Sequence, residues 1–107
     1  SDDMLIIRGV NVFPSQVESV LLSLGNTTPY YQLIVDRVNN TDTLEIQIEL
    51  SQEMFSDTVK SLEDEENAIK ASIESTLGIA AKIRLVEPKS IARSEGKAVR
   101  VIDKRKK

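Results

Sequence analysis

The residues best suited to chemistry lie near the carboxyl-terminal end of the sequence, in the segment 92–98, which reads Ala-Arg-Ser-Glu-Gly-Lys-Ala. This segment lies between two short apolar stretches, 83–86 and 99–102. Because small and charged residues cannot build a core, we expect an exposed loop whose ends are fixed by strands and whose Gly96 leaves the backbone free. Such a loop would present the ammonium group of Lys97 well.

The Gly96-Lys97 pair is not a Walker phosphate loop. No second glycine precedes it at the required spacing, and no Ser or Thr follows the lysine. On its own, a glycine followed by a lysine is typical of ordinary surface loops. The pair therefore indicates a function only together with other features of the chain.

Two missing residue types limit the chemistry that this chain can do. The sequence contains no cysteine and no histidine. Disulfides, thiolate zinc sites, cysteine nucleophiles and Ser-His arrangements are thereby excluded. Any catalysis by this chain depends on Lys, Arg, Asp, Glu, hydroxyl groups or backbone amides.

Three other charged runs are interpreted as solvated surface. The pair Asp2-Asp3 could ligate a metal but is typical of an exposed terminus, and the acidic run 63–66 is typical of an exposed helix face. The basic run 104–107 could contact nucleic acid, but at the end of a chain of net charge −3 it is typical of a frayed tail. We expect no metal site and no nucleic-acid partner.

Length and composition indicate one globular domain. The chain has 107 residues, of which 40% are apolar and only 4% aromatic, so its core must be aliphatic. No apolar run approaches the ~20 residues needed to cross a bilayer, and the amino terminus lacks the pattern of a signal peptide. We expect a soluble cytoplasmic domain with no membrane partner. Because the sequence opens directly on an apolar strand pattern, we also expect it to be cut from something longer.

The first half of the chain predicts strands around one helix. The stretch 4–7 predicts a strand or hairpin arm, and 8–11 predicts a turn because its Gly and Asn tolerate positive φ. Pro14 suits the first position of a helix, and Gly25 suits the left-handed residue after it. The apolar residues between them share one stripe: Val17, Val20, Leu21 and Leu24.

A hairpin should follow, with strands at 31–38 and 43–50 around a turn at 39–42. The second strand alternates strictly between apolar and polar residues, which is typical of a half-buried strand. One face carries Leu44, Ile46, Ile48 and Leu50, and the other carries Glu45, Gln47 and Glu49.

The second half predicts another helix and further strands. Ser56 suits the N-cap, with Asp57 in the first turn, and Gly78 suits the end. The apolar stripe of this helix comprises Val59, Leu62, Ile69, Ile73 and Leu77, and the acidic run 63–66 should loosen its first half. A strand at 81–87 should stop before Pro88, and a short strand should follow the Lys97 loop.

The order βαββαβ with a tail predicts an α+β fold, a two-layer sandwich of a small antiparallel sheet with two helices on one face. Domains of this kind bind amino acids, metals or RNA, or dimerise, so the fold alone does not define a function.

Both ends of the sequence resemble motifs of the adenylate-forming enzymes. Residues 1–18, SDDMLIIRGVNVFPSQVE, are similar to their hinge motif: an Asp pair, an apolar strand, a glycine turn, a proline and a helix bearing Glu. Residues 85–105 resemble the terminal motif of one branch, the phenylacetate–coenzyme A ligases. The Gly-Arg that usually precedes the Asp pair is missing. Two motifs in the right order and at domain-length spacing are much more specific than either alone.

The resemblance implies that residues 1–107 form the mobile C-terminal domain of an acyl-activating ligase, a fragment that starts at the hinge and lacks the large N-terminal domain. Lys97 is then the catalytic lysine of adenylation, in a loop with Arg93, Ser94, Glu95 and Gly96. Asp2 and Asp3 form the hinge, and the turn Arg8, Gly9, Val10 and Asn11 faces coenzyme A.

The implied substrates are an aryl carboxylic acid, ATP with Mg²⁺ and coenzyme A, with ATP and Mg²⁺ held mainly by the N-terminal domain. Two other hypotheses remain open. One is a paralogue that adenylates a carboxylate without using coenzyme A. The other is a free-standing βαββαβ module for ligand binding or dimerisation, in which Lys97 is an ordinary surface residue.

Overall fold

The fold was analysed in a computed structural model, which describes residues 4–25, 28, 30–55, 58–94, 97–98 and 100–105. For residues 93, 94, 97 and 98 it describes the backbone. The predicted Asp2-Asp3 hinge and the N-cap at Ser56 and Asp57 therefore lie outside the described residues, as do Glu95 and Gly96.

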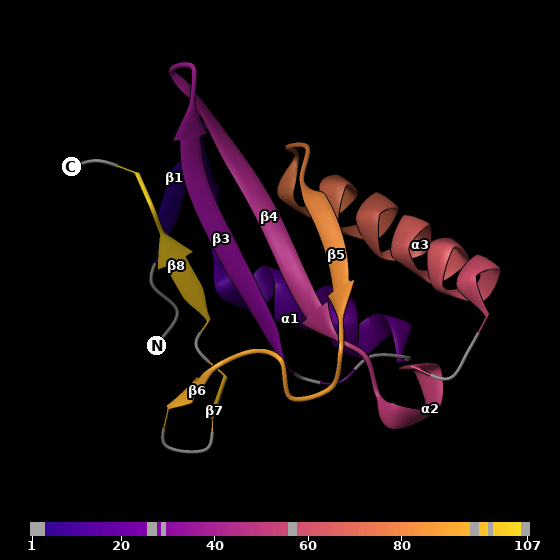
Figure 1. The fold of residues 1–107 in the computed structure, drawn as a ribbon. Coiled ribbons are helices and arrows are strands. Elements are labelled where there is room, and N and C mark those ends of the chain that lie inside the picture. The colour runs from indigo at the N-terminus through magenta and orange to yellow at the C-terminus, as the bar shows by residue number, and fades with distance from the viewer. Residues whose placement is uncertain are drawn as a thin grey trace.

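A four-stranded sheet forms one layer of the molecule (Figure 1). Its strands are β3 (Tyr31–Val38), β4 (Thr41–Glu49), β5 (Lys82–Val86) and β8 (Val101–Asp103), in the order β5-β4-β3-β8. The central hairpin β3–β4 is antiparallel, whereas β5 pairs with β4 and β8 pairs with β3 in parallel. The α+β class is confirmed, but the sheet is mixed rather than antiparallel. The reason is that a helical crossover after β4 brings β5 back in the same direction.

In the part of the chain that the structure describes, three helices accompany the sheet: α1 (Pro14–Leu24), the short α2 (Gln52–Phe55), which was not predicted, and α3 (Val59–Leu77). In Figure 1, α1 lies behind the central strands and α3 lies beside β5. Pro14 begins α1, and Gly25 ends it with a φ of 76°, as predicted. Gly78 ends α3 in the same left-handed conformation, with a φ of 80°.

The stripe of α3 differs from its prediction at the amino-terminal end. Thr58 caps the helix, and its side chain accepts a hydrogen bond from the backbone N–H of Ser61. Val59 is 73% exposed, so the buried stripe begins later, with Ile69, Ile73 and Leu77. The acidic run 63–66 lies within a continuous helix, because packing of the second half holds the whole element.

Two small hairpins complete the fold (Figure 1). One joins β1 (Leu5–Ile7) to β2 (Val10–Val12), and the other joins β6 (Arg93–Ser94) to β7 (Lys97–Ala98). The β1–β2 hairpin does not join the main sheet, because the free edge of β3 pairs with β8.

Among the described residues, one apolar core joins the β1–β2 hairpin and two of the helices to the main sheet. It combines residues of the β1–β2 hairpin, α1, α3 and the sheet: Ile7, Val12, Val17, Val20, Leu21, Tyr31, Leu33, Val35, Leu44, Ile46, Ile48, Ile69, Ile73, Leu77, Ala81 and Ile83. None of the described helices is long and apolar enough to cross a membrane.

Candidate functional site

The segment of Lys97 is a short hairpin rather than an irregular loop. Lys97 pairs with Ser94, and Arg93 pairs with Ala98. The described backbone on both sides of residues 95 and 96 is therefore paired across the hairpin. This arrangement fixes the Cα of Lys97 more closely than a free loop would.

Arg100 anchors the chain directly after this hairpin. Its carbonyl oxygen accepts a 2.7 Å hydrogen bond from the backbone N–H of Leu33. Its guanidinium carbon lies 4.2 Å from the centre of the Tyr31 ring, a cation–π contact. A terminal nitrogen of Arg100 also lies 3.9 Å from the carboxylate of Glu18 on α1. The hairpin is thus tied to the sheet at its carboxyl-terminal side.

The predicted turn at 8–11 is shorter than expected. Arg8 and Gly9 form a two-residue turn with φ values of 50° and 76°, whereas Val10 and Asn11 belong to β2. Positive φ at both central residues is the geometry of tight hairpin turns, and it is strained for a residue with a side chain such as Arg8. Nothing lies within 4 Å of the position that a Cβ on Gly9 would occupy, so the turn presents open backbone to its surroundings.

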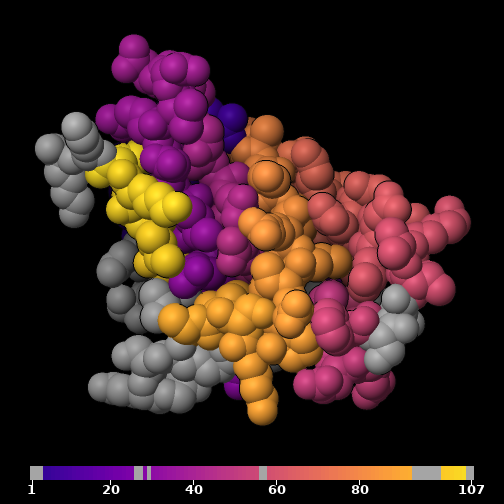
Figure 2. All heavy atoms as spheres, viewed as in Figure 1, coloured from indigo at the N-terminus to yellow at the C-terminus, as the bar shows by residue number. Residues whose placement is uncertain are grey.

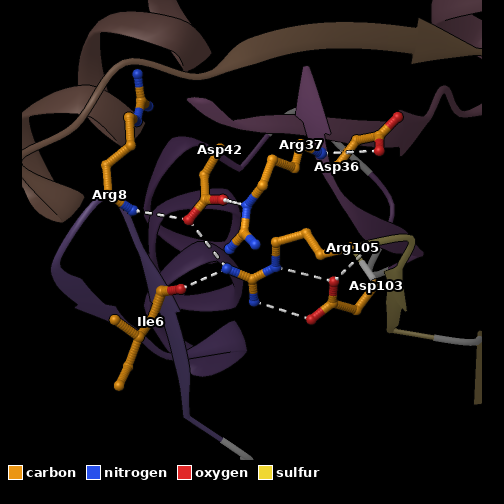
Figure 3. Close-up of polar contacts among 7 residues, drawn as sticks. All are labelled: Ile6, Arg8, Asp36, Arg37, Asp42, Asp103 and Arg105. Carbon is orange, nitrogen blue, oxygen red and sulfur yellow. Dashed lines mark hydrogen bonds and ion pairs between the residues drawn. The ribbon is translucent and has the colours of Figure 1, made fainter. Parts of the chain in front are cut away.

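Asp42 holds this turn through a polar cluster (Figure 3). Its Oδ2 accepts hydrogen bonds from the backbone N–H of Arg8 at 3.2 Å and from the guanidinium of Arg105 at 3.1 Å. Its Oδ1 accepts one from Nε of Arg37 at 2.9 Å. The hydrogen bond from Arg37 and the one from the Arg8 backbone hold the pKa of Asp42 below its ordinary value.

Arg105 connects the last described strand to the first. One terminal nitrogen donates to the carbonyl of Ile6 at 2.6 Å, and its other nitrogens hydrogen-bond Asp103 at 2.9 and 3.0 Å. The Arg105 side chain is only 14% exposed. The interpretation of 104–107 as a frayed tail is therefore wrong for Arg105, because a largely buried guanidinium with several acceptors is fixed in place.

The Arg8 side chain points away from Asp42 in Figure 3 and donates to the carbonyl oxygen of Ala80. The next residue is fixed as well, since the backbone N–H of Ala81 donates to a carboxylate oxygen of Glu74 at 3.1 Å. That hydrogen bond, with a smaller contribution from Lys70, lowers the pKa of Glu74. The turn is thus held to α3 and β5 as well as to the central hairpin.

Sequence reasoning did not find these holding residues. The sequence pattern indicates only that Asp42 belongs to the turn at 39–42, and no local pattern distinguishes Glu74 from the other acidic residues of its helix. One signal could have revealed Arg105, because the terminal motif extends to it, beyond the predicted end of the last strand.

The glycine turn and the lysine hairpin lie at opposite ends of the sheet. Asp42, beside the turn, stands at the beginning of β4, whereas Glu49 and the segment toward the hairpin stand at its end. The rise of an extended strand separates residues 42 and 49 by roughly 23 Å. Figure 1 shows β6 and β7 below the sheet and the β3–β4 tip above it. The structure therefore does not bring the two predicted functional segments together.

No group of three or more Asp and Glu side chains that could hold a metal ion occurs within the part of the chain that the structure describes.

A small α+β domain with a glycine turn at one end and a lysine hairpin at the other matches a known class of enzyme domain. The family described as the AMP-binding enzyme C-terminal domain matches residues 9–105, and the chain belongs to this family.

Within the family, the chain is similar to phenylacetate–coenzyme A ligases. It is 43% identical to that of Escherichia coli over 98% of its own length and 24% of the relative's. It is 40% identical to that of Thermus thermophilus, over 99% and 27% respectively. The chain thus spans about a quarter of the length of the curated relatives that it matches.

Two solved structures share this fold. A domain of a phenylacetate–coenzyme A ligase from Bacteroides vulgatus matches with a TM-score of 0.88 at 30% identity, covering 98% of this chain and 95% of that one. A 2-hydroxyisobutyryl-CoA ligase, in complex with 2-HIB-AMP and CoA in its thioesterification state, matches with a TM-score of 0.87 at 34% identity, over 97% and 22%. The resemblance inferred from the two terminal motifs is confirmed.

Proposed function

We propose that this chain is the mobile C-terminal domain of a cytoplasmic aryl-acid–coenzyme A ligase of the phenylacetate type. The whole enzyme would join a carboxylate to ATP, giving an acyl-adenylate and pyrophosphate, and then transfer the acyl group to coenzyme A. The observation that carries this proposal is the match to phenylacetate–coenzyme A ligases over nearly the whole chain.

Lys97 would serve the first half-reaction. A carboxylate oxygen forms a bond to the α-phosphorus of ATP while the bond to pyrophosphate breaks. Attack of one anion on another requires positive charge nearby, and a lysine with a pKa of about 10.4 carries that charge at neutral pH. A hairpin that fixes the lysine backbone reduces the reorganisation needed at the moment of reaction.

The Arg8-Gly9 turn would serve the second half-reaction. The sulfur of coenzyme A forms a bond to the acyl carbon, the bond to AMP breaks, and the thiol proton leaves to solvent. A thin pantetheine arm can pass close to backbone where no side chain stands, and open space surrounds Gly9.

A rotation about Asp2 and Asp3 would exchange the two segments. Segments at opposite ends of a strand that rises roughly 23 Å between residues 42 and 49 are not expected to reach one acyl-adenylate in a single orientation of the domain. A hinge of a few residues that change φ and ψ is sufficient for such an exchange.

Within the residues that the structure describes, no group of three or more acidic side chains offers a metal site of its own. We assign ATP and Mg²⁺ mainly to an N-terminal domain, which would be the principal partner of this chain. No step above depends on the metal.

The test is to assay the full-length protein with ATP, coenzyme A and a panel of aryl acids. Acid-dependent exchange of pyrophosphate together with thioester formation is expected for at least one acid. Exchange without a thioester would instead favour the paralogue that does not use coenzyme A. If neither occurs, or if the complete reading frame encodes only this domain, the ligase proposal is wrong.

A further inference from the structure

Glu49 is buried on the face of the sheet that its sequence pattern predicts to be solvated. The alternation along β4 places it on the same face as Glu45 and Gln47, yet only 2% of Glu49 is exposed. The covering layer is the segment 87–92, which follows β5. In Figure 2 the orange atoms of this segment lie across the lower end of the sheet.

Both oxygens of the Glu49 carboxylate accept hydrogen bonds from the backbone of that segment. Oε1 accepts from the N–H of Lys89 at 2.7 Å, and Oε2 accepts from the N–H of Ile91 at 2.9 Å. The backbone at Lys89 has a φ of 66°, which is strained for a residue with a side chain. Charge-assisted hydrogen bonds on either side of this residue can hold the strained conformation.

The segment held by Glu49 leads directly into the lysine hairpin. Ile91 is 4% exposed and lies two residues before Arg93, the first residue of β6. On the other side of the hairpin, Arg100 is fixed against Tyr31 and Leu33. Both ends of the hairpin are therefore attached to the sheet, at Glu49 and at Arg100.

We infer that Glu49 is a positioning residue for adenylation: it fixes the base of the hairpin and thereby the placement of Lys97. The inference rests on the proposed function of Lys97. A carboxylate withdrawn from water is costly unless hydrogen bonds satisfy it. Glutamine keeps the shape of the side chain but removes its negative charge and replaces one acceptor oxygen with an NH₂ donor, so it can accept from only one of the two amides.

The experiment compares Glu49→Gln with Glu45→Gln in the full-length protein. Glu45 lies on the same strand and face but hydrogen-bonds Gln47 and lies near Lys82, away from the segment 87–92. Each variant is assayed for pyrophosphate exchange and, separately, for thioester formation from supplied acyl-adenylate. Because a small displacement of a catalytic group can cost about 10²-fold, Glu49→Gln should slow exchange by roughly tenfold to a hundredfold. Thioester formation by Glu49→Gln should proceed at the wild-type rate. Glu45→Gln should show wild-type rates in both assays.

A wild-type rate of pyrophosphate exchange in Glu49→Gln would overturn the inference. An equal loss in both half-reactions would also overturn it, because that result indicates general damage to the fold. If Glu49→Gln does not fold, Glu49→Asp takes its place, since it keeps the charge on a side chain too short to reach both amides.

Hydrogen exchange separates this inference from the proposed function. Amides 89 and 91 should exchange faster in Glu49→Gln than in Glu45→Gln, whether or not the enzyme is a ligase. If the wild-type protein lacks pyrophosphate exchange while hydrogen exchange at amides 89 and 91 is still faster in Glu49→Gln, the proposed function is wrong, but the contact between Glu49 and the segment 87–92 is supported. If amides 89 and 91 exchange hydrogen equally fast in both variants, Glu49 does not fix the segment 87–92 and the inference is wrong.

Discussion

At the scale of single residues, the charge of Lys97 is the feature most open to test. In the full-length protein, Lys97→Ala should slow pyrophosphate exchange by about 10²–10³-fold, because one donor aimed at developing charge is typically worth that much. Thioester formation from supplied acyl-adenylate should remain normal. Lys104→Ala removes the same charge from an exposed position after β8 and should leave both rates unchanged.

Gly9 offers a comparison with a second glycine of the same geometry. Gly9 and Gly25 both have a φ of 76°, and nothing lies within 4 Å of the Cβ that either would carry. Leucine at either position should cost a similar ~1–2 kcal/mol of stability, the penalty of left-handed backbone. Only Gly9→Leu should block thioester formation, with exchange preserved. If Gly25→Leu reduces thioester formation equally, the loss reflects strain rather than access for coenzyme A.

At the scale of elements, local signals account for what the sequence predicts well. Pro14, an apolar stripe and Gly25 define α1 within twelve residues, and each signal acts on its own neighbourhood. The β3–β4 hairpin is equally local: its turn at Asn39 and Asn40, with φ values of 52° and 64°, joins two strands that pair along their whole length.

Elements joined by distant contacts are predicted less well. Alternation along β4 assigns a face to Glu49 but does not reveal that the segment 87–92 covers that face. The placement of β8 beside β3 depends on pairing across about seventy residues, and no local pattern encodes such pairing. The two terminal motifs identify the candidate site, whereas the contacts that hold it become visible only in the structure.

The cluster around Asp42 predicts a pH dependence of stability. The pKa of Asp42 is lowered in the folded state, so its ionised form favours folding. This contribution is complete above the ordinary value near 3.8 and disappears as the pH falls through the lower, folded-state pKa. The difference in melting temperature between wild type and Asp42→Asn should therefore be largest near neutral pH and shrink on acidification below about pH 4.

The control for this measurement is Asp64→Asn, which removes an exposed carboxylate of α3. A difference between wild type and Asp42→Asn that stays constant from neutral to acidic pH would show that the hydrogen bonds of Asp42 do not depend on its charge.

At the scale of the whole molecule, both functional ends are attached to one sheet: the glycine turn through the apolar core, and the lysine hairpin through Glu49 and Arg100. Ile7 from the β1–β2 hairpin and Ile46 from the central strand belong to the same buried cluster, and Arg105 ties the last described strand to the first hairpin. The turn and the lysine hairpin are therefore attached to the same sheet, at its opposite ends. The exchange of segments proposed above would therefore be a rotation of the whole domain rather than a rearrangement within it.

This construction predicts a single cooperative unfolding transition for the 107-residue chain. Ile46→Ala should lower the free energy of unfolding by about 2–5 kcal/mol, because it leaves a cavity in the shared core. Ile102→Ala, a matched isoleucine that is 39% exposed on β8, should change it by less than about 1 kcal/mol. Denaturant titration followed by circular dichroism and by tyrosine fluorescence should give coincident midpoints. Two separate transitions would mean that the β1–β2 hairpin unfolds independently. The Arg8-Gly9 turn would then not keep a fixed position relative to the rest of the domain during the proposed rotation.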